Sequence, residues 1–233
     1  MWVAAVLLAA SFTVNDASYS HPRQITIYRS AQPAKNLFVF IESELYQTEI
    51  GLPATLDALK IPATVVTIEI TERAGEITNR KKFADFVAND LMPALKEKLG
   101  ALPDARHTAI GGYSFGGLTA AYVAVQHPEI FGNVLSQSGA FWRGNEGASD
   151  PPEWLTQQLR EKPKLPIRFY IEVGAEEHQV VPNRMEFIVA NRHLRDVLAA
   201  KKYDFKYVEV PGAKHEPGHW KAALPAGIAW LAQ

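Results

Sequence analysis

Apolar residues follow two different rhythms along this chain. Short apolar runs rich in β-branched residues predict buried strands at Ile25–Tyr28, Leu37–Ile41, Thr64–Ile70, Thr108–Gly112, Asn133–Ser138, Ile167–Val173 and Phe205–Val210. Between several of these runs, apolar residues recur at spacings of three and four, which predicts helices over Phe83–Leu95, Leu118–Val125, Met185–Lys202 and Trp220–Leu231. Strands that alternate with helices are typical of an α/β fold with a mostly parallel central sheet and helices on both faces. In such sheets, ligands bind at the carboxyl ends of the strands.

Two segments depart from this pattern. Residues 143–164 are rich in glycine and proline, with one short helix expected near Trp154–Leu159. They predict a surface excursion, which is either a lid or a plain loop. Residues 1–20 form a signal-like segment or an N-terminal extension, and residues 21–233 form a single domain.

The apolar run Trp2–Ala10 has two interpretations. It is shorter than the roughly 20 residues that a membrane span needs, so we expect no stable membrane insertion. Its length suits the core of an export signal, which would place the protein in the periplasm or outside the cell. However, a signal peptide should begin with a positively charged region, and no Lys or Arg precedes Arg23. The alternative is an ordinary N-terminal strand or helix of a cytoplasmic protein.

Composition narrows the classes of function. The formal net charge of −1 over 233 residues gives no reason to expect nucleic acid as a partner. The absence of cysteine excludes a thiol nucleophile, a disulfide scaffold and a cysteine-based zinc site. A domain of this length can bury its own core without such aids. The sequence does not indicate an oligomeric state.

The most informative stretch is Gly111–Gly117, which reads GGYSFGG. It contains the pattern G-x-S-x-G, between an expected strand and an expected helix, which is the setting of a nucleophile elbow. Glycines two residues before and two after Ser114 avoid a collision in so sharp a turn. We therefore predict that Ser114 is a nucleophile. The amide of Phe115, at the start of the helix, is then placed to stabilise an oxyanion.

A serine nucleophile needs a base, and in this kind of fold the acid and the histidine follow the serine in that order. His215 lies in a loop between the last expected strand and the last expected helix, so we favour it over its rival His219. The acid is expected after the strand that ends at Val173. Glu177 is our first candidate and Glu176 the second. Solvated loop glutamates are the simpler alternative.

A competing motif overlaps this histidine. His215-Glu-Pro-Gly-His219 matches H-E-x-x-H, which binds zinc when it lies on a helix. Pro217 and Gly218 are poor residues for a helix interior, with costs of about 3 and 1 kcal/mol. A helix that begins near Pro217 leaves His215 outside it. We therefore expect no metal site and no cofactor.

Three stretches resemble the putative-esterase family, which includes esterase D, feruloyl and acetyl-xylan esterases and enterochelin esterases. They are Gly112–Leu118, His127–Gly132 and Ser136–Trp142, and the resemblance extends from about Leu37 to the C-terminus. It implies an α/β-hydrolase fold.

The resemblance also implies roles for single residues. Ser114 falls on the family's nucleophile and Glu177 on its acid. His215 falls on its histidine, because Trp220 follows five residues later. An Arg-x-x-Glu element, Arg73 to Glu76, resembles one near the active-site mouth, where a basic group suits an anionic substrate.

The second oxyanion amide is where the chain departs from the family. Where the family often has Asp-Gly or His-Gly, this chain has Glu42-Ser43-Glu44. Any residue other than proline still supplies an N–H, so the amide of Ser43 or Glu44 is the candidate.

The expected function is ester hydrolysis through an acyl-enzyme on a Ser-His-Glu triad. The partner is then a small-molecule ester, for example a siderophore ester, a feruloyl or acetyl sugar, or a short acyl ester. Tyr113, Trp142 and Trp220 are candidates for contact with the substrate. Two alternatives remain open, namely acyl transfer on the same triad and a catalytically silent binding protein of this fold.

Overall fold

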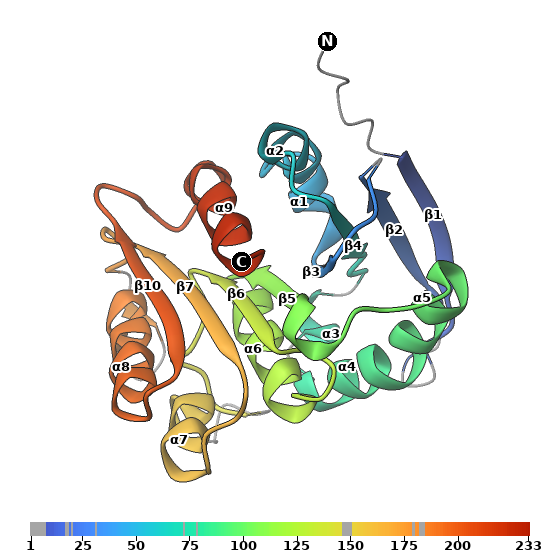
Figure 1. Ribbon diagram of the computed structural model, residues 1–233. Helices are drawn as coiled ribbons and strands as arrows, with labels where there is room; N and C mark the ends of the chain where they lie inside the picture. Colours follow the sequence, from blue (N-terminus) through green and yellow to red (C-terminus); the bar gives the residue numbers. More distant parts are fainter. Residues whose placement is uncertain are drawn as a thin grey trace.

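A computed structural model describes residues 8–16, 19, 21–30, 32–71, 73–77, 79–145, 151–178, 180–181 and 185–233. A central sheet of eight strands crosses this part of the chain in the order β1-β2-β4-β3-β5-β6-β7-β10 (Figure 1). The strands are β1 (Leu8–Val14), β2 (Arg23–Arg29), β3 (Asn36–Ile41), β4 (Ala63–Ile68), β5 (Thr108–Tyr113), β6 (Asn133–Gln137), β7 (Arg168–Gly174) and β10 (Asp204–Val210).

The sheet is mostly parallel, as predicted. The strands from β4 to β10 in that order pair in parallel, whereas β1 and β2 add an antiparallel edge. Val39 in the centre of β3 pairs with Val66 on one side and Ile110 on the other. Every residue of β3, β5 and β6 is buried, which explains why their sequences are apolar runs without alternation. All seven predicted strands are confirmed within one or two residues.

Helices cover both faces of the sheet (Figure 1). One face packs against α2 (Leu52–Leu59) and α9 (Pro217–Leu231). The other packs against α4 (Arg80–Phe86), α5 (Met92–Leu99), α6 (Phe115–Gln126), α7 (Trp154–Glu161) and α8 (Phe187–Ala200). A π-helical turn, Val87–Leu91, joins α4 to α5. The four predicted helices are confirmed, although α8 begins two residues later than Met185.

Several short elements were not predicted. They are α1 (Ser43–Gln47), α3 (Arg73–Glu76), the 3₁₀ turn Ala105–His107 and the two-residue strands β8 (Val180–Val181) and β9 (Met185–Glu186). The longer helix α2 was not predicted either. Apart from α2, these elements have at most five residues, which is too short for a hydrophobic period to be recognised. None of the described helices is long and apolar enough to cross a bilayer.

The two atypical segments are only partly described. Leu8–Val14 forms the edge strand β1, while residues 1–7 lie outside the described residues. The export-signal interpretation therefore stays a prediction. Within residues 143–164, α7 occupies the place of the expected short helix. Residues 146–150 lie outside the described part, so the choice between lid and loop is not tested.

Candidate active site

Ser114 stands at a sharp turn between β5 and α6. Its φ of 52° and ψ of −119° lie in a region that residues other than glycine rarely adopt. A Cβ on Gly112 would lie 2.4 Å from the carbonyl carbon of Gly116, so the turn requires glycine there. The sequence pattern thus gives the predicted elbow, with Ser114 at the carboxyl end of a central strand.

Three loops bring their side chains together at this edge of the sheet. His215 comes from the loop after β10, and Glu177 from the loop after β7. The Nε2 atom of His215 lies 3.0 Å from the Oγ of Ser114, and its Nδ1 atom lies 2.8 Å from the Oε2 of Glu177. An ionised carboxylate only accepts hydrogen bonds, so Nδ1 carries the proton of the neutral imidazole. Nε2 is then an acceptor, and Ser114 donates to it. In this arrangement the imidazole can take the hydroxyl proton.

Glu177 is fully buried and its second oxygen is held by two donors. The Oε1 atom accepts hydrogen bonds from the Ser138 hydroxyl at 2.5 Å and from the amide of Gly174 at 2.8 Å. The indole N–H of Trp220 donates to the oxygen of Ser138 at 3.0 Å. Because an indole N–H can only donate, the Ser138 proton must point to Glu177. Glu176, the other candidate acid, is exposed to solvent.

His219 has a different partner. Its Nε2 atom lies 2.6 Å from the Oε2 of Glu172 on β7, and both side chains are buried. The orientation is not that of a linear hydrogen bond, so the contact is best described as a close charge contact. Burial raises the pKa of Glu172. Burial acts to lower the pKa of His219, but the close carboxylate of Glu172 outweighs this effect and the pKa is raised.

The H-E-x-x-H match does not form a shared helical face. The helix α9 begins at Pro217, so His215 lies outside it, and the two imidazoles have the separate partners given above. Within the described ranges, no three His, Cys, Asp or Glu side chains are grouped so as to hold a metal ion.

Aromatic side chains surround His215. Trp220 meets it edge-on at 5.1 Å between ring centres and stacks on Tyr113 at 4.5 Å. Phe187 also packs against His215, at 4.6 Å between ring centres. Trp220 is only 4% exposed and its indole N–H is used by Ser138. Its surroundings are those of a residue that positions His215 and Ser138, while its predicted contact with substrate stays a prediction.

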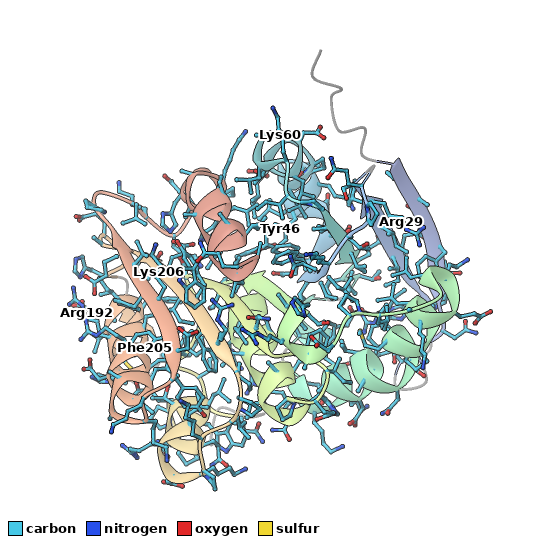
Figure 2. The ribbon with its side chains drawn as sticks, viewed as in Figure 1. Arg29, Tyr46, Lys60, Arg192, Phe205 and Lys206 are labelled. Atoms are coloured by element: carbon cyan, nitrogen blue, oxygen red, sulfur yellow. The ribbon has the colours of Figure 1, made fainter. Side chains whose placement is uncertain are left out.

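Two hydrogen bonds link Tyr46, through Gln137, to the backbone of Trp220. Tyr46 donates to the side-chain oxygen of Gln137 at 3.0 Å, and the Gln137 amide donates to the carbonyl of Trp220 at 2.8 Å. Figure 2 shows Tyr46 in the interior, and burial is the main reason that its pKa is well above the usual value. These bonds attach the start of α9 to β6 and α1.

The predicted oxyanion residues lie next to the elbow. Ser43 and Glu44 begin α1, directly after β3, while Phe115 begins α6. A Cβ on Gly116 would lie 2.9 Å from the Oε2 of Glu42, so the residue that follows β3 lies close to the first turn of α6. Amides in the first turn of a helix have no acceptor within it. The Ser43 hydroxyl is bonded to Gln47 at 2.5 Å, and Glu44 is exposed.

A cavity of about 290 Å³ opens beside the elbow, over the ends of β3 and β4. Its lining carries three carboxylates and is otherwise mixed, with Glu42, Glu44, Leu45, Thr48, Glu49, Ile70 and Tyr113. This side of Ser114 is therefore acidic.

The Arg73-x-x-Glu76 element forms α3. The side chain of Arg73 lies outside the described residues, so its predicted role is not tested. Glu76 is fully buried, where it binds Arg23 and lies 3.0 Å from the Nε2 of His21. Arg23 also donates to Asp16 at 2.6 Å. Glu76 thus attaches α3 to the start of β2.

The sequence did not reveal the groups that support the acid. Ser138 and the Glu172–His219 pair depend on contacts between residues that are distant in the chain, whereas the amide of Gly174 reaches Glu177 within one local turn. The only signal in the sequence was that Ser138 lies in the stretch Ser136–Trp142 that resembles the family.

Comparisons with known proteins identify similar esterases. The model of the family described as "Putative esterase" matches residues 62–231. The iron(III) enterobactin esterase of Escherichia coli O6:H1 is 31% identical over 206 residues, which cover 84% of this chain and 50% of that protein. The iron(III) salmochelin esterase of the same organism is 27% identical over 230 residues, covering 90% and 54%.

A solved structure is similar over nearly the whole chain. The enterobactin esterase of Shigella flexneri, determined in the presence of enterobactin, superposes with a TM-score of 0.83 at 25% identity. The match covers 98% of this chain and 60% of that one. The chain thus spans about half the length of the curated relatives it matches. The predicted α/β-hydrolase fold is confirmed.

Proposed function

This chain belongs to the putative-esterase family of α/β hydrolases, and from that premise we propose that it is a serine carboxylic-ester hydrolase. The observation that carries the proposal is the continuous hydrogen-bonded path from Ser114 through His215 to Glu177. A hydroxyl, an imidazole and a buried carboxylate in this order make a weak nucleophile reactive.

The proposed reaction has two steps. His215 takes the proton of Ser114 as Oγ attacks the ester carbonyl carbon, and the tetrahedral intermediate collapses as His215 gives that proton to the leaving alcohol. Water then attacks the acyl-enzyme as His215 takes one of its protons. His215 returns that proton to the Oγ of Ser114 as the bond to the acyl group breaks and the acid leaves. Glu177 holds the tautomer of His215 and stabilises its charged form.

The oxyanion is proposed to be stabilised by two backbone amides. One is that of Phe115, which lies at the positive end of α6. The other is that of Ser43 or Glu44, which the closeness of β3 to the elbow supports. Such donors act without reorganisation, and each typically contributes about 3 kcal/mol to the transition state.

Siderophore esters are the substrate class that we propose. The support is that the relatives reported above are named for iron(III) enterobactin and iron(III) salmochelin. The sequence alone had left sugar esters and short acyl esters equally open.

Hydrolysis of enterobactin tests both parts of the proposal. The purified protein is incubated with enterobactin, with and without iron(III), and the products are followed by mass spectrometry. We expect products that have gained one water for each ester bond cleaved, and no products from Ser114→Ala. If 4-nitrophenyl butyrate is cleaved but enterobactin is not, the siderophore class is wrong and the ester hydrolase stands. If the Ser114→Ala protein is as active as the wild type, the proposed nucleophile is wrong.

A further inference from the structure

A tight turn after β6 is fixed to the backbone of Ser114. The amide of Ala140 donates to the carbonyl oxygen of Ser114 at 2.9 Å. The amide of Arg143 in turn donates to the carbonyl oxygen of Ala140 at 3.1 Å. Trp142 and Arg143 therefore have a set position relative to the elbow. They lie on the β6 side of Ser114, whereas the acidic cavity lies on the β3 side.

Arg143 has its guanidinium against aromatic rings and not against a carboxylate. Its central carbon lies 4.9 Å from the ring centre of Phe115 and 5.5 Å from that of Trp142. The side chain is partly buried, and burial lowers the pKa of the guanidinium. In the described part of the chain no acidic group forms an ion pair with it. Glu153, which donates its amide to Trp142, instead pairs with His193 at 2.8 Å.

Three other arginines are arranged differently. Arg23, Arg168 and Arg192 each pair with at least one carboxylate within 3 Å. A partly desolvated cation without a counter-ion is costly, and rings alone compensate it only in part. A bound anion would supply the counter-ion that the described part of the chain does not provide for Arg143.

Trp142 provides a second and independent donor. It is only 8% exposed, and its indole N–H is buried with no acceptor among the residues that the structure describes. A buried N–H normally has a partner. The ring also joins Arg143 to the proposed catalytic centre, because Phe187 packs 6.3 Å from Trp142 and 4.6 Å from His215 between ring centres. Because Phe115 and Trp142 are also in contact, at 6.1 Å between ring centres, a series of ring contacts leads from Phe115 to His215.

We infer that Arg143 and the indole N–H of Trp142 form a subsite for an anionic group of the ester, a carboxylate or a phenolate. The inference rests on the proposed function and deepens it, because it assigns residues to the charge of the substrate. Arg143 attracts the anion on the β6 side, while the carboxylates of Glu42, Glu44 and Glu49 disfavour it on the β3 side. Charge thus orients the substrate across Ser114.

Two pairs of esters matched in size test this inference. In the first pair the acyl group differs in charge, as in the 4-nitrophenyl monoester of glutaric acid and 4-nitrophenyl valerate. In the second pair the alcohol differs, as in the butyrates of 4-hydroxybenzoate and of phenol. For at least one pair we expect the wild-type protein to have a higher kcat/KM for the anionic ester. That preference should weaken as salt is added.

Variants then assign the preference to residues. We expect Arg143→Gln to lower kcat/KM for the anionic ester about tenfold to a hundredfold, the usual effect of losing a charge-assisted hydrogen bond. The neutral ester should change by less than about threefold. Arg143→Lys should retain part of the preference, and Trp142→Phe should show a smaller loss than Arg143→Gln. The control is Arg160→Gln, which replaces an exposed arginine on α7.

The outcomes separate this inference from the function on which it rests. Equal losses for anionic and neutral esters in Arg143→Gln, or no charge preference in either pair, would overturn the subsite. Neutral esters would still be hydrolysed in those cases. If no ester is hydrolysed by the folded wild-type protein, the proposed function itself fails.

Discussion

Ser138 is the residue that fixes the orientation of Glu177. Its φ of 49° is rare for a side chain larger than glycine, and its hydroxyl is held between Trp220 and Glu177. A conformation of this kind in a buried serine is consistent with a functional constraint. Ser138 touches no proposed reacting atom, so we regard it as a positioning residue.

Ser138→Gly should remove this donor without backbone strain, because glycine readily adopts a positive φ. We expect kcat for a simple ester to fall about tenfold to a hundredfold, as for other residues that orient a catalytic group. KM should change little, whereas the free energy of unfolding should fall by about 1 to 3 kcal/mol because the buried indole N–H of Trp220 loses its acceptor. Ser136→Ala is the control, because the Ser136 hydroxyl is also buried but has no hydrogen bond in the described part. A loss in KM or stability alone would contradict the positioning role.

The Glu172–His219 pair makes stability depend on pH. The pKa of His219 is raised, so the folded protein keeps a proton that the unfolded chain has released. This contribution is complete below the ordinary pKa of histidine, about 6.5. It is lost as the pH rises through the pKa of the folded pair, with a slope of up to about 1.4 kcal/mol per pH unit for one proton.

Urea unfolding at a series of pH values from 6 to 9 measures this slope. The wild type should lose free energy of unfolding across the range, whereas the double variant Glu172→Gln/His219→Gln should lose less. His107→Gln, at an exposed histidine, should keep the wild-type slope. Identical slopes in the wild type and the double variant would show that the pair does not hold the extra proton.

At the scale of elements, the strand–turn–helix unit of β5 and α6 depends on close backbone contact. We expect Gly112→Ala to destabilise the protein by about 3 kcal/mol, because the new Cβ meets backbone that cannot move aside. Gly218→Ala is the control. A Cβ on Gly218 meets nothing within 4 Å, and alanine is favoured in the first turn of α9. Thermal unfolding of both variants checks this, and equal stability would contradict it.

The elements differ in how far their sequence predicts them. The strands β3, β5 and β6 are short runs that are buried on both faces, so their apolar pattern has one simple explanation. The helices α1 and α3 have four or five residues, and contacts with distant residues hold them. Buried Glu76, for example, binds Arg23 from another element. Such contacts form only when the chain has folded, so the local sequence pattern does not predict them.

The candidate site shows the same division. Local pattern and chain order were enough to select Ser114, His215 and Glu177, because strand ends and the order of residues constrain them. The supporting contacts of Ser138, Trp220 and His219 join residues that lie up to 82 positions apart in the chain. Which of these distant residues meet in space is not evident from the sequence. The charge difference between the β3 and β6 sides of Ser114 also needed the structure.

At the scale of the whole molecule, the sheet brings together residues that are distant in the chain. Ser114 and His215 are 101 positions apart, and Glu177 lies between them. All three fall within the range matched by the family model. The carboxyl ends of parallel strands lie at the same edge of the sheet. The loops that follow β5, β7 and β10 therefore meet at that edge. The fold thus supplies positions, and the side chains at them supply the proposed chemistry.

The central claim is that Ser114 is an activated nucleophile, and covalent labelling tests it most directly. The purified protein is treated with a fluorophosphonate probe, with and without a zinc chelator, and the modified peptide is located by mass spectrometry. We predict a single adduct on Ser114 that persists in the chelator and is absent from Ser114→Ala. A folded wild-type protein that remains unlabelled, or is labelled at another residue, would contradict the assignment of Ser114, His215 and Glu177 as the catalytic centre.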